Sequence, residues 1–283
     1  MVQFTPRPIK ENVNVSKVSL KSEFFVLTLG LMAILVVSYL ALGLAMDILI
    51  DRMPAKVEQA AAKLFQFKGF ETPEKYQEAN KEIQALLDEV AAYWPESSRA
   101  FTVHIVESED ANAFALPGGR IVLMSGLLKE VESQNELAMI LGHELGHYAH
   151  RDHLRALGRG VVFMVAASVL FGTDSGVADL IGTTLSTIDL KFSRTQEMRA
   201  DQFALGLLNK KYGHVAGATD FFERLEKKKD LPRFLNFLLT HPLSAQRIDM
   251  INNNIVSLHY TIEPKIPVNP DFKELFSLKK EGM

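Results

Sequence analysis

Two histidines and a glutamate have the residue types and spacing of a metal-dependent hydrolase. They lie in the run His143-Glu144-Leu145-Gly146-His147. Residues i and i+4 of a helix lie one turn apart on the same face, so both imidazoles can reach one metal ion. Glu144 is offset around the helix by one residue, which keeps it out of the ligand set but lets it act as a general base on water. The run therefore predicts the HExxH arrangement of zinc proteases, with one Zn²⁺ per chain.

A catalytic zinc site needs a third protein ligand. The chain of 283 residues has no cysteine, so that ligand must be His, Asp or Glu. His150 and His153 follow closely, but His150 lies too far along the helix from His143 to share the ion easily. We expect both of these histidines at polar surface or supporting positions.

Glu197 is the stronger candidate for the third ligand. Glu197 and Asp201 are again four residues apart, so a second helix can present one carboxylate to the metal and the other one turn away. That second carboxylate can accept the free N–H of a ligand histidine and fix its tautomer. An acidic helix face is usually only solvated, but its pairing with HExxH predicts that Glu197 is a ligand and Asp201 its support.

The pattern around these motifs predicts an α+β, mainly helical domain. A helix over residues 133–157 carries HExxH, and its opposite side is apolar. Two earlier helices are predicted at 54–65 and 73–93, the second with Thr72 as its N-cap and Pro73 in its first turn.

A small β section is predicted beside the active-site helix. Its apolar runs cover 101–106, 111–116 and 120–125, and Pro117-Gly118-Gly119 supplies a turn between the last two. We therefore expect a small antiparallel hairpin or sheet.

The N-terminal part of the chain predicts a membrane anchor. Residues 1–23 form a polar tail, and residues 24–46 contain no charge, which is long enough for a helix to span a bilayer. A signal peptide is the alternative, although its apolar region is usually about 7–15 residues long. Basic residues before the span favour a cytoplasmic N-terminus, which places the domain at 47–283 outside the cytoplasm, on the periplasmic side.

Composition and a second apolar stretch complete this picture. The formal net charge of −3 argues against nucleic acid as a partner. The stretch from Gly160 to Leu190 is predicted as one or two buried helices, with a membrane-contacting pair as the alternative.

The motifs and their surroundings resemble a known protease family. The segments ANAFALPGGRIVLMSGLL, NELAMILGHELGHYAHRDH and FSRTQEMRADQFAL are similar to the membrane-associated gluzincins of metallopeptidase family forty-eight, which includes CAAX prenyl endopeptidases and HtpX-like quality-control proteases. The similarity covers roughly residues 54–260. It implies a zincin-like fold, with Glu144 as the catalytic base, Asp201 as the partner of a ligand histidine, and zinc bound by His143, His147 and Glu197.

One predicted span, where the prenyl endopeptidases and HtpX-like members have several, places the chain nearer the Oma and BepA-like branch. Thr240-His241-Pro242 and Arg247-Ile248 resemble the H-P-x-x-x-x-R-I element of that branch. His241 could stabilise an oxyanion or occupy the open zinc position in a resting state. Arg247 could contact substrate or pair with a carboxylate. The structural alternative is a helix entry in which Pro242 breaks the chain and Ser244 caps the helix.

A substrate-binding strand is predicted at Asn112-Ala113-Phe114-Ala115, continuing to Leu116. An exposed edge strand near the zinc could pair with an extended peptide through its main chain. Plain core β structure is the alternative.

Together these features predict a membrane-tethered zinc metalloendopeptidase. We expect its substrates to be unfolded polypeptides, and the resemblance implies quality control of misfolded or unassembled membrane and envelope proteins. The alternative is a tethered chaperone or adaptor that keeps the zinc site but rarely cleaves.

Overall fold

The computed structural model describes residues 19–54, 57–59, 70–95, 97, 100–160, 192–227, 237–242 and 245–277. Most of the helix predicted at 54–65, and residues 161–190 of the second apolar stretch, lie outside the described residues.

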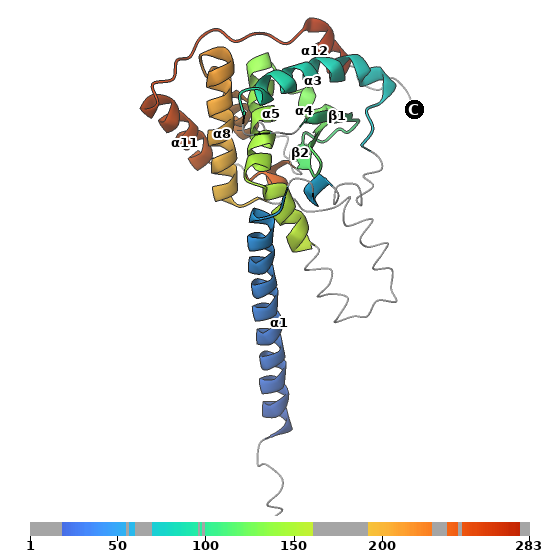
Figure 1. Cartoon of the computed structure of the whole chain (residues 1–283), viewed down its shortest axis with the longest axis vertical. Coiled ribbons are helices and arrows are strands. Elements are labelled where there is room, and N and C mark those ends of the chain that lie inside the picture. The colour runs from blue at the N-terminus through green and yellow to red at the C-terminus, as the bar shows by residue number, and fades with distance from the viewer. Residues whose placement is uncertain are drawn as a thin grey trace, which may run out of the picture.

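A long apolar helix, α1 (Leu20–Asp51), extends from one end of the domain (Figure 1). It begins at Ser19, whose hydroxyl accepts a hydrogen bond from the Ser22 N–H. Within the described part of the chain, α1 is the one helix long and apolar enough to cross a membrane. Its large apolar side chains are exposed, and Leu27 is 73% exposed. Only the last turns of α1, around Ile50, are buried against the domain.

The β section is a three-stranded sheet in the order β1-β3-β2. The predicted hairpin is confirmed, because β2 pairs with β3 antiparallel. β1 lies on the other side of β3 and pairs with it in parallel. The strand bounds are Thr102–Val106 for β1, Ala113–Leu116 for β2 and Arg120–Met124 for β3.

The helix predicted at 73–93 is present as the 3-10 turn η1 (Glu74–Tyr76) followed by α3 (Gln77–Ala91). The predicted N-cap was wrong: Thr72 makes no cap to this helix, and its hydroxyl instead accepts the Ile105 N–H at 3.0 Å. Thr72 therefore ties the start of the helix to β1.

The helix predicted over 133–157 is broken. α5 (Gln134–Ala149) begins at Ser133, whose hydroxyl caps the Glu136 N–H, and it ends before His150. Arg151 adopts a left-handed φ of 57°, and a second helix follows over 152–160. A left-handed φ ends a right-handed helix because it turns the backbone out of the helical path, and a non-glycine residue is uncommon there because its side chain crowds the backbone.

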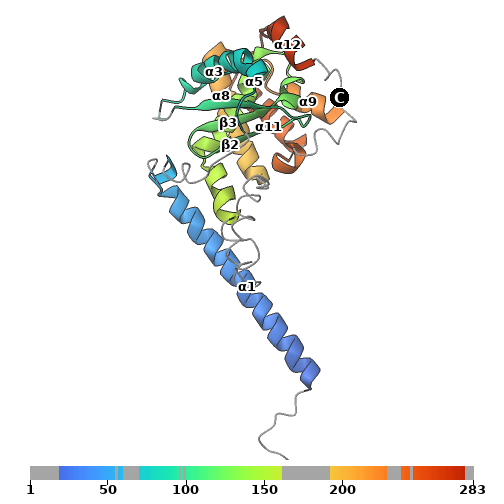
Figure 2. The same ribbon diagram turned by 90° about the vertical axis from the view of Figure 1, so that its right-hand side faces the viewer.

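Helices α3 and α8 and strand β2 pack against α5, in the domain at the top of Figure 2. Α long helix, α8, lies directly beside it and carries the acidic motif, and Ser193 and Gln196 form a reciprocal capping box at its start. The core contains side chains from α3, the sheet, α5, α8 and the C-terminal helices. The bounds are Ser125–Leu128 for α4, Arg194–Tyr212 for α8, Asp220–Lys227 for α9, Ala245–Ser257 for α11 and Pro270–Ser277 for α12.

Candidate metal centre

Small residues let α5 and α8 approach each other closely. A Cβ atom added to Gly146 would lie 2.7 Å from the Cα of Ala200. One added to Gly142 would lie 3.1 Å from the Cα of Ala204. The two backbones are therefore close enough for a carboxylate on α8 to reach the imidazoles on α5.

The predicted ligands converge at this seam between α5 and α8. His143 Nε2 lies 3.1 Å from His147 Nε2 and 3.5 Å from Glu197 Oε2. His147 Nε2 lies 3.3 Å from Glu197 Oε1. His241 joins them, with its Nδ1 3.3 Å from His143 Nε2 and 3.2 Å from Glu197 Oε1. All four side chains are buried, and one ligand atom from each lies within 4.8 Å of the others.

These separations fit the donors of one tetrahedral zinc ion. Zinc–ligand bonds of about 2.0–2.1 Å place tetrahedral donors about 3.3 Å apart. Glu197 Oε2 is buried and pairs with Arg247 Nη1 at 2.5 Å, while it also faces His143 Nε2 at 3.5 Å. Two imidazoles and a carboxylate are also a donor set that zinc prefers. The residues present therefore fit this metal.

The electrostatics of the site favour a positive charge between the ligands. Burial opposes ionisation of Glu197, but the charges of His241 and His143 hold the pKa of its carboxyl well below the usual range. Burial lowers the pKa of His143. Against the effect of burial, hydrogen bonds to Asp152 and Glu197 raise the pKa of His147 to about 9. The surrounding carboxylates therefore favour a positive charge at this position.

His143 is oriented by Asp201, as the spacing on α8 predicts. Its Nδ1 lies 2.9 Å from Asp201 Oδ1. Arg247 donates to the same carboxylate through Nε and Nη2, both at 2.8 Å. Burial alone would raise the pKa of Asp201, but the charge and hydrogen bonds of Arg247 and the bond from His143 lower it.

His147 is oriented by Asp152, a residue that the sequence reasoning missed. Asp152 Oδ2 lies 3.1 Å from His147 Nδ1, and its Oδ1 accepts a hydrogen bond from Gln196 Nε2 at 2.7 Å. Despite the opposing effect of burial, hydrogen bonds from His147 and Gln196 lower the pKa of Asp152. The ring of Phe192 stacks on His147, with centroids 3.8 Å apart. An acidic residue five positions after the second histidine was the available signal.

Other sequence-predicted residues lie in different surroundings. Of the two roles predicted for Arg247, the structure shows pairing with a carboxylate, because its guanidinium is fully buried between Asp201 and Glu197. His150 contacts the Gly146 carbonyl through Nδ1, at 2.8 Å. His153 is buried and lies 3.2 Å from Glu58 Oε1.

The predicted substrate strand borders the metal centre. β2 is an edge strand of the sheet. The Ala113 carbonyl accepts a hydrogen bond from His241 Nε2 at 3.2 Å, and the Ala113 N–H donates to Asn112 Oδ1 at 2.9 Å. Thr240 Oγ1 also donates to Asn112 Oδ1, at 3.3 Å. The segment carrying His241 therefore docks on the start of β2.

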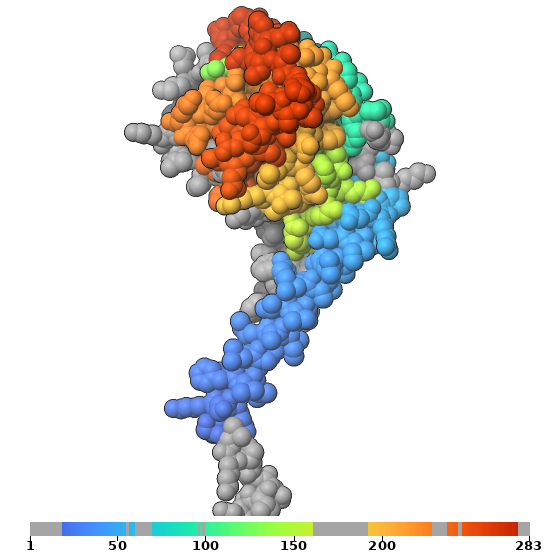
Figure 3. Space-filling model, turned by 90° about the vertical axis from the view of Figure 1, so that its left-hand side faces the viewer, coloured from blue at the N-terminus to red at the C-terminus, as the bar shows by residue number. Residues whose placement is uncertain are grey.

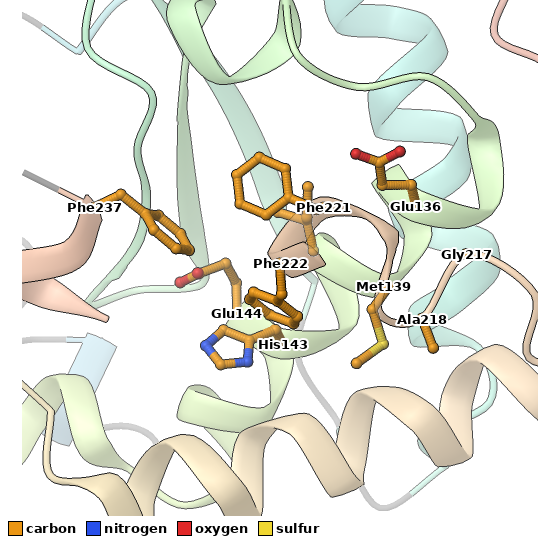
Figure 4. A pocket seen from close by; sticks show the side chains of 10 residues that line it. Glu136, Met139, His143, Glu144, Gly217, Ala218, Phe221, Phe222 and Phe237 are labelled. Carbon is orange, nitrogen blue, oxygen red and sulfur yellow. The ribbon is translucent and has the colours of Figure 1, made fainter. Parts of the chain in front are cut away.

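A narrow apolar pocket lies next to the two motif residues His143 and Glu144. Figure 4 shows the rings of Phe221, Phe222 and Phe237 near the Glu144 carboxylate and the His143 ring. Oε2 of Glu144 is buried and has no hydrogen-bond partner among the residues that the structure describes. The glutamate of HExxH therefore places an unpaired carboxylate oxygen beside this pocket.

Comparison with known proteins gives a consistent assignment. The sequence model of Peptidase family M48 matches residues 77–255. The mitochondrial Metalloendopeptidase OMA1 of Bos taurus is 28% identical over 199 residues, which cover 64% of this chain and 38% of that protein. The Beta-barrel assembly-enhancing protease of Escherichia coli is 27% identical over 164 residues, covering 52% of this chain and 33% of that protein.

A shorter relative matches over more of its own length. Metalloprotease YcaL of Escherichia coli is 33% identical over 156 residues, covering 53% of this chain and 60% of that protein. In the two longer relatives, the matched part is only 38% and 33% of the protein. The matched part is therefore less than two thirds of each of these three relatives.

Proposed function

Because the chain belongs to Peptidase family M48, whose zinc metalloendopeptidase site it carries in His143, His147 and Glu197, we propose that it hydrolyses internal peptide bonds of unfolded polypeptides beside a membrane. One zinc ion per chain is part of this proposal. The observation that carries it is the convergence of three buried ligands next to a glutamate with an unpartnered oxygen.

Glu144 is the proton carrier in this proposal. Zinc, when bound, supplies a Lewis acid that polarises the scissile carbonyl and makes water easier to deprotonate. Glu144 takes the proton from the attacking water and returns it to the leaving amine. Its position next to the apolar pocket keeps bulk water away from that proton. Asp201 keeps His143 in the tautomer that presents Nε2 to the metal.

Two roles were predicted for His241: stabilising an oxyanion, or occupying the open zinc position in a resting state. Its position supports the resting-state role. Its Nδ1 lies as close to His143 Nε2 and Glu197 Oε1 as the three ligands lie to one another. A catalytic zinc site keeps one position open. We therefore infer that His241 occupies the fourth position at rest and leaves it before cleavage. Once displaced, its imidazole N–H is available to stabilise a developing negative charge on the substrate.

An extended, unfolded segment is the substrate that suits the surroundings. Movement of His241 would free the Ala113 carbonyl on the edge strand β2 for pairing with a peptide backbone. Pairing through the main chain depends little on the amino-acid sequence of the bound peptide. The apolar pocket suits the hydrophobic side chains that misfolded proteins expose. Similarity to a protein named Beta-barrel assembly-enhancing protease supports membrane or envelope proteins as the substrates.

We further propose that α1 is a retained single-pass anchor, with the catalytic domain on the periplasmic side. A row of exposed apolar side chains over a helix of 32 residues is stable in lipid rather than in water. Arg151 donates to the carbonyls of Ile50 and Met53, which supports retention of this helix over its removal as a signal peptide.

The test is cleavage of an unfolded protein such as casein by the purified full-length chain. We expect turnover with zinc, none after chelation, and a loss of about 10²–10⁴-fold for Glu144→Gln, which should still bind zinc. Glu78→Gln, an exposed change on α3, is the matched control. Parental cleavage by Glu144→Gln would refute the assigned base. Zinc binding without any turnover would favour the alternative, a tethered chaperone or adaptor held closed by His241.

A further inference from the structure

The carboxylate behind His147 is held by groups outside the two metal-binding motifs. Asp152 is fully buried and uses one oxygen for His147 Nδ1 and the other for Gln196 Nε2. A carboxylate that accepts the outer N–H of a ligand imidazole fixes the orientation of the ring and raises its basicity. The position of Asp152 therefore controls how His147 faces the metal.

The turn that places Asp152 is held by the C-terminal end of α1, where the helix meets the domain. Arg151, with its left-handed φ of 57°, immediately precedes Asp152. Its Nη1 donates to the carbonyl oxygens of Ile50 and Met53 at 2.5 and 2.6 Å. These are carbonyls at the C-terminal end of α1, which a cation satisfies well. The unusual backbone conformation before Asp152 is therefore stabilised by the anchor.

Arg155 connects the same end of α1 to Asp152 through charge. Its guanidinium pairs with Asp51, lies 3.6 Å from Asp47 Oδ1, and lies 3.6 Å from Asp152 Oδ1. The anchor carboxylates, together with the His150 carbonyl that accepts from Arg155 Nη1, thus hold Arg155 beside Asp152 but outside hydrogen-bond distance. Without the two carboxylates, the guanidinium can turn onto Asp152 Oδ1, where it competes with Gln196 Nε2 and rotates the carboxylate away from His147.

The two parts are in contact over a continuous surface. Figure 3 shows the light-blue end of α1 lying against the yellow-green part of the domain that contains helix 152–160. An added Cβ at Gly158 would meet Met46 Cε at 3.0 Å and Ile50 Cδ1 at 3.2 Å. The last turns of the anchor are therefore packed on the helix that begins with Asp152.

We propose that the acidic last turns of α1, through Arg155, position Asp152 and so hold His147 in the geometry that binds the metal. Asp152 is a positioning residue, and the anchor is part of the metal centre rather than a passive tether. This inference rests on the proposed function only in taking zinc as the metal. It makes zinc retention depend on how the end of the anchor is docked.

The test measures zinc release from the full-length, detergent-solubilised chain into a chromogenic chelator, without any substrate. We expect Asp152→Asn to weaken zinc binding by about 10–100-fold. The double change Asp47→Asn with Asp51→Asn should accelerate release by a smaller factor. Glu23→Gln, which removes an acid from the other end of α1, should release zinc at the parental rate.

A rescue experiment distinguishes coupling from a general loss of structure. If Arg155 is the competing cation, the double change should have no effect in a chain that also carries Arg155→Gln. An effect that persists unchanged in that background overturns the proposal. Parental zinc release by the double variant also overturns it. The same holds if the double change lowers the melting temperature of the apo-protein but leaves zinc release unchanged.

Folding and activity do not confound this test. The side chains of Asp47 and Asp51 are 40% and 61% exposed, and asparagine has nearly the shape of aspartate, so the double change leaves no buried cavity and keeps the test available if Asp152→Asn fails to fold. A chain that shows the coupling but cleaves no polypeptide would overturn the proposed function alone. A chain that cleaves casein but releases zinc independently of Asp47 and Asp51 would overturn this inference alone.

Discussion

The seam between α5 and α8 and the junction between α1 and helix 152–160 support the two ligand histidines in different ways. At the seam, Gly146 of α5 faces the backbone of Ala200 in α8. His143 of α5 is oriented by Asp201, which also lies in α8. At the junction, Gly158 faces the ends of two flexible side chains, and His147 receives Asp152 from the start of the docked helix.

This contrast indicates which part of the metal centre is held in place by the domain alone. Backbone-to-backbone packing leaves little freedom, because protein interiors are close-packed and transmit strain. Contacts through side-chain ends and partly exposed charges can adjust, and each contributes less. The His143 side is therefore fixed by the core, whereas the His147 side responds to what is docked next to it.

The largest effect is expected at the seam, from Asp201→Asn. Among the described residues, the change leaves the buried Arg247 guanidinium with only Glu197 as a charged partner, at 2.5 Å. Breaking a buried ion pair by removing one partner costs about 3–5 kcal/mol, and we expect the lower end because Glu197 remains. Chemical denaturation of the full chain measures this loss.

Asp249→Asn is the control for that experiment, since Asp249 is exposed on the same helix as Arg247. The control should leave the free energy of unfolding nearly unchanged. A smaller loss for Asp201→Asn than for Asp152→Asn would reverse the comparison, because the junction would then be the more rigid support.

The parts of the site that follow from helical spacing could be predicted from the sequence. His143, His147, Glu197 and Asp201 lie on two helices at i and i+4, and this geometry is local to each helix. The hairpin followed from its Pro-Gly-Gly turn in the same way. The two helices approach closely because Gly142 and Gly146 of α5 pack against alanines of α8. A glycine within a helix does not indicate in the sequence which residue it packs against.

The parts that depend on tertiary contacts could not be predicted. Helical periodicity continues through Arg151, so the break before Asp152 becomes visible only when the anchor carbonyls that stabilise it are in place. The burial of Arg247 likewise depends on α11 packing against α8. Parallel pairing of β1 with β3 joins segments separated by β2, and alternation of apolar residues does not indicate strand order.

A smaller effect is expected from Gly146→Ala. The added methyl group would lie 2.7 Å from the Ala200 Cα and 2.9 Å from its carbonyl oxygen, and neither backbone atom can move aside alone. Overpacking of this kind costs about 1–3 kcal/mol, and it should also separate Glu197 from the imidazoles. Unfolding and zinc binding measured on one sample should therefore weaken together.

Gly206→Ala is the matched control, because Gly206 lies in α8 with nothing within 4 Å of its added Cβ. Alanine there should stabilise the helix by roughly 0.5–1 kcal/mol. If Gly146→Ala were as harmless as Gly206→Ala, the close approach of α5 and α8 would not be what holds the ligands together.

The smallest effect is expected from the same substitution at the junction, Gly158→Ala. The added methyl group meets Met46 Cε and Ile50 Cδ1, which are the far ends of flexible side chains and can shift by a few tenths of an ångström. The helix gains roughly 0.5–1 kcal/mol from alanine, which offsets the adjustment, so the free energy of unfolding should change little. Zinc release is the more sensitive measurement, because any displacement of α1 would reach His147 through Arg155 and Asp152. A cost equal to that of Gly146→Ala would mean that the anchor meets the domain as rigidly as α8 meets α5. The two histidines would then be supported alike.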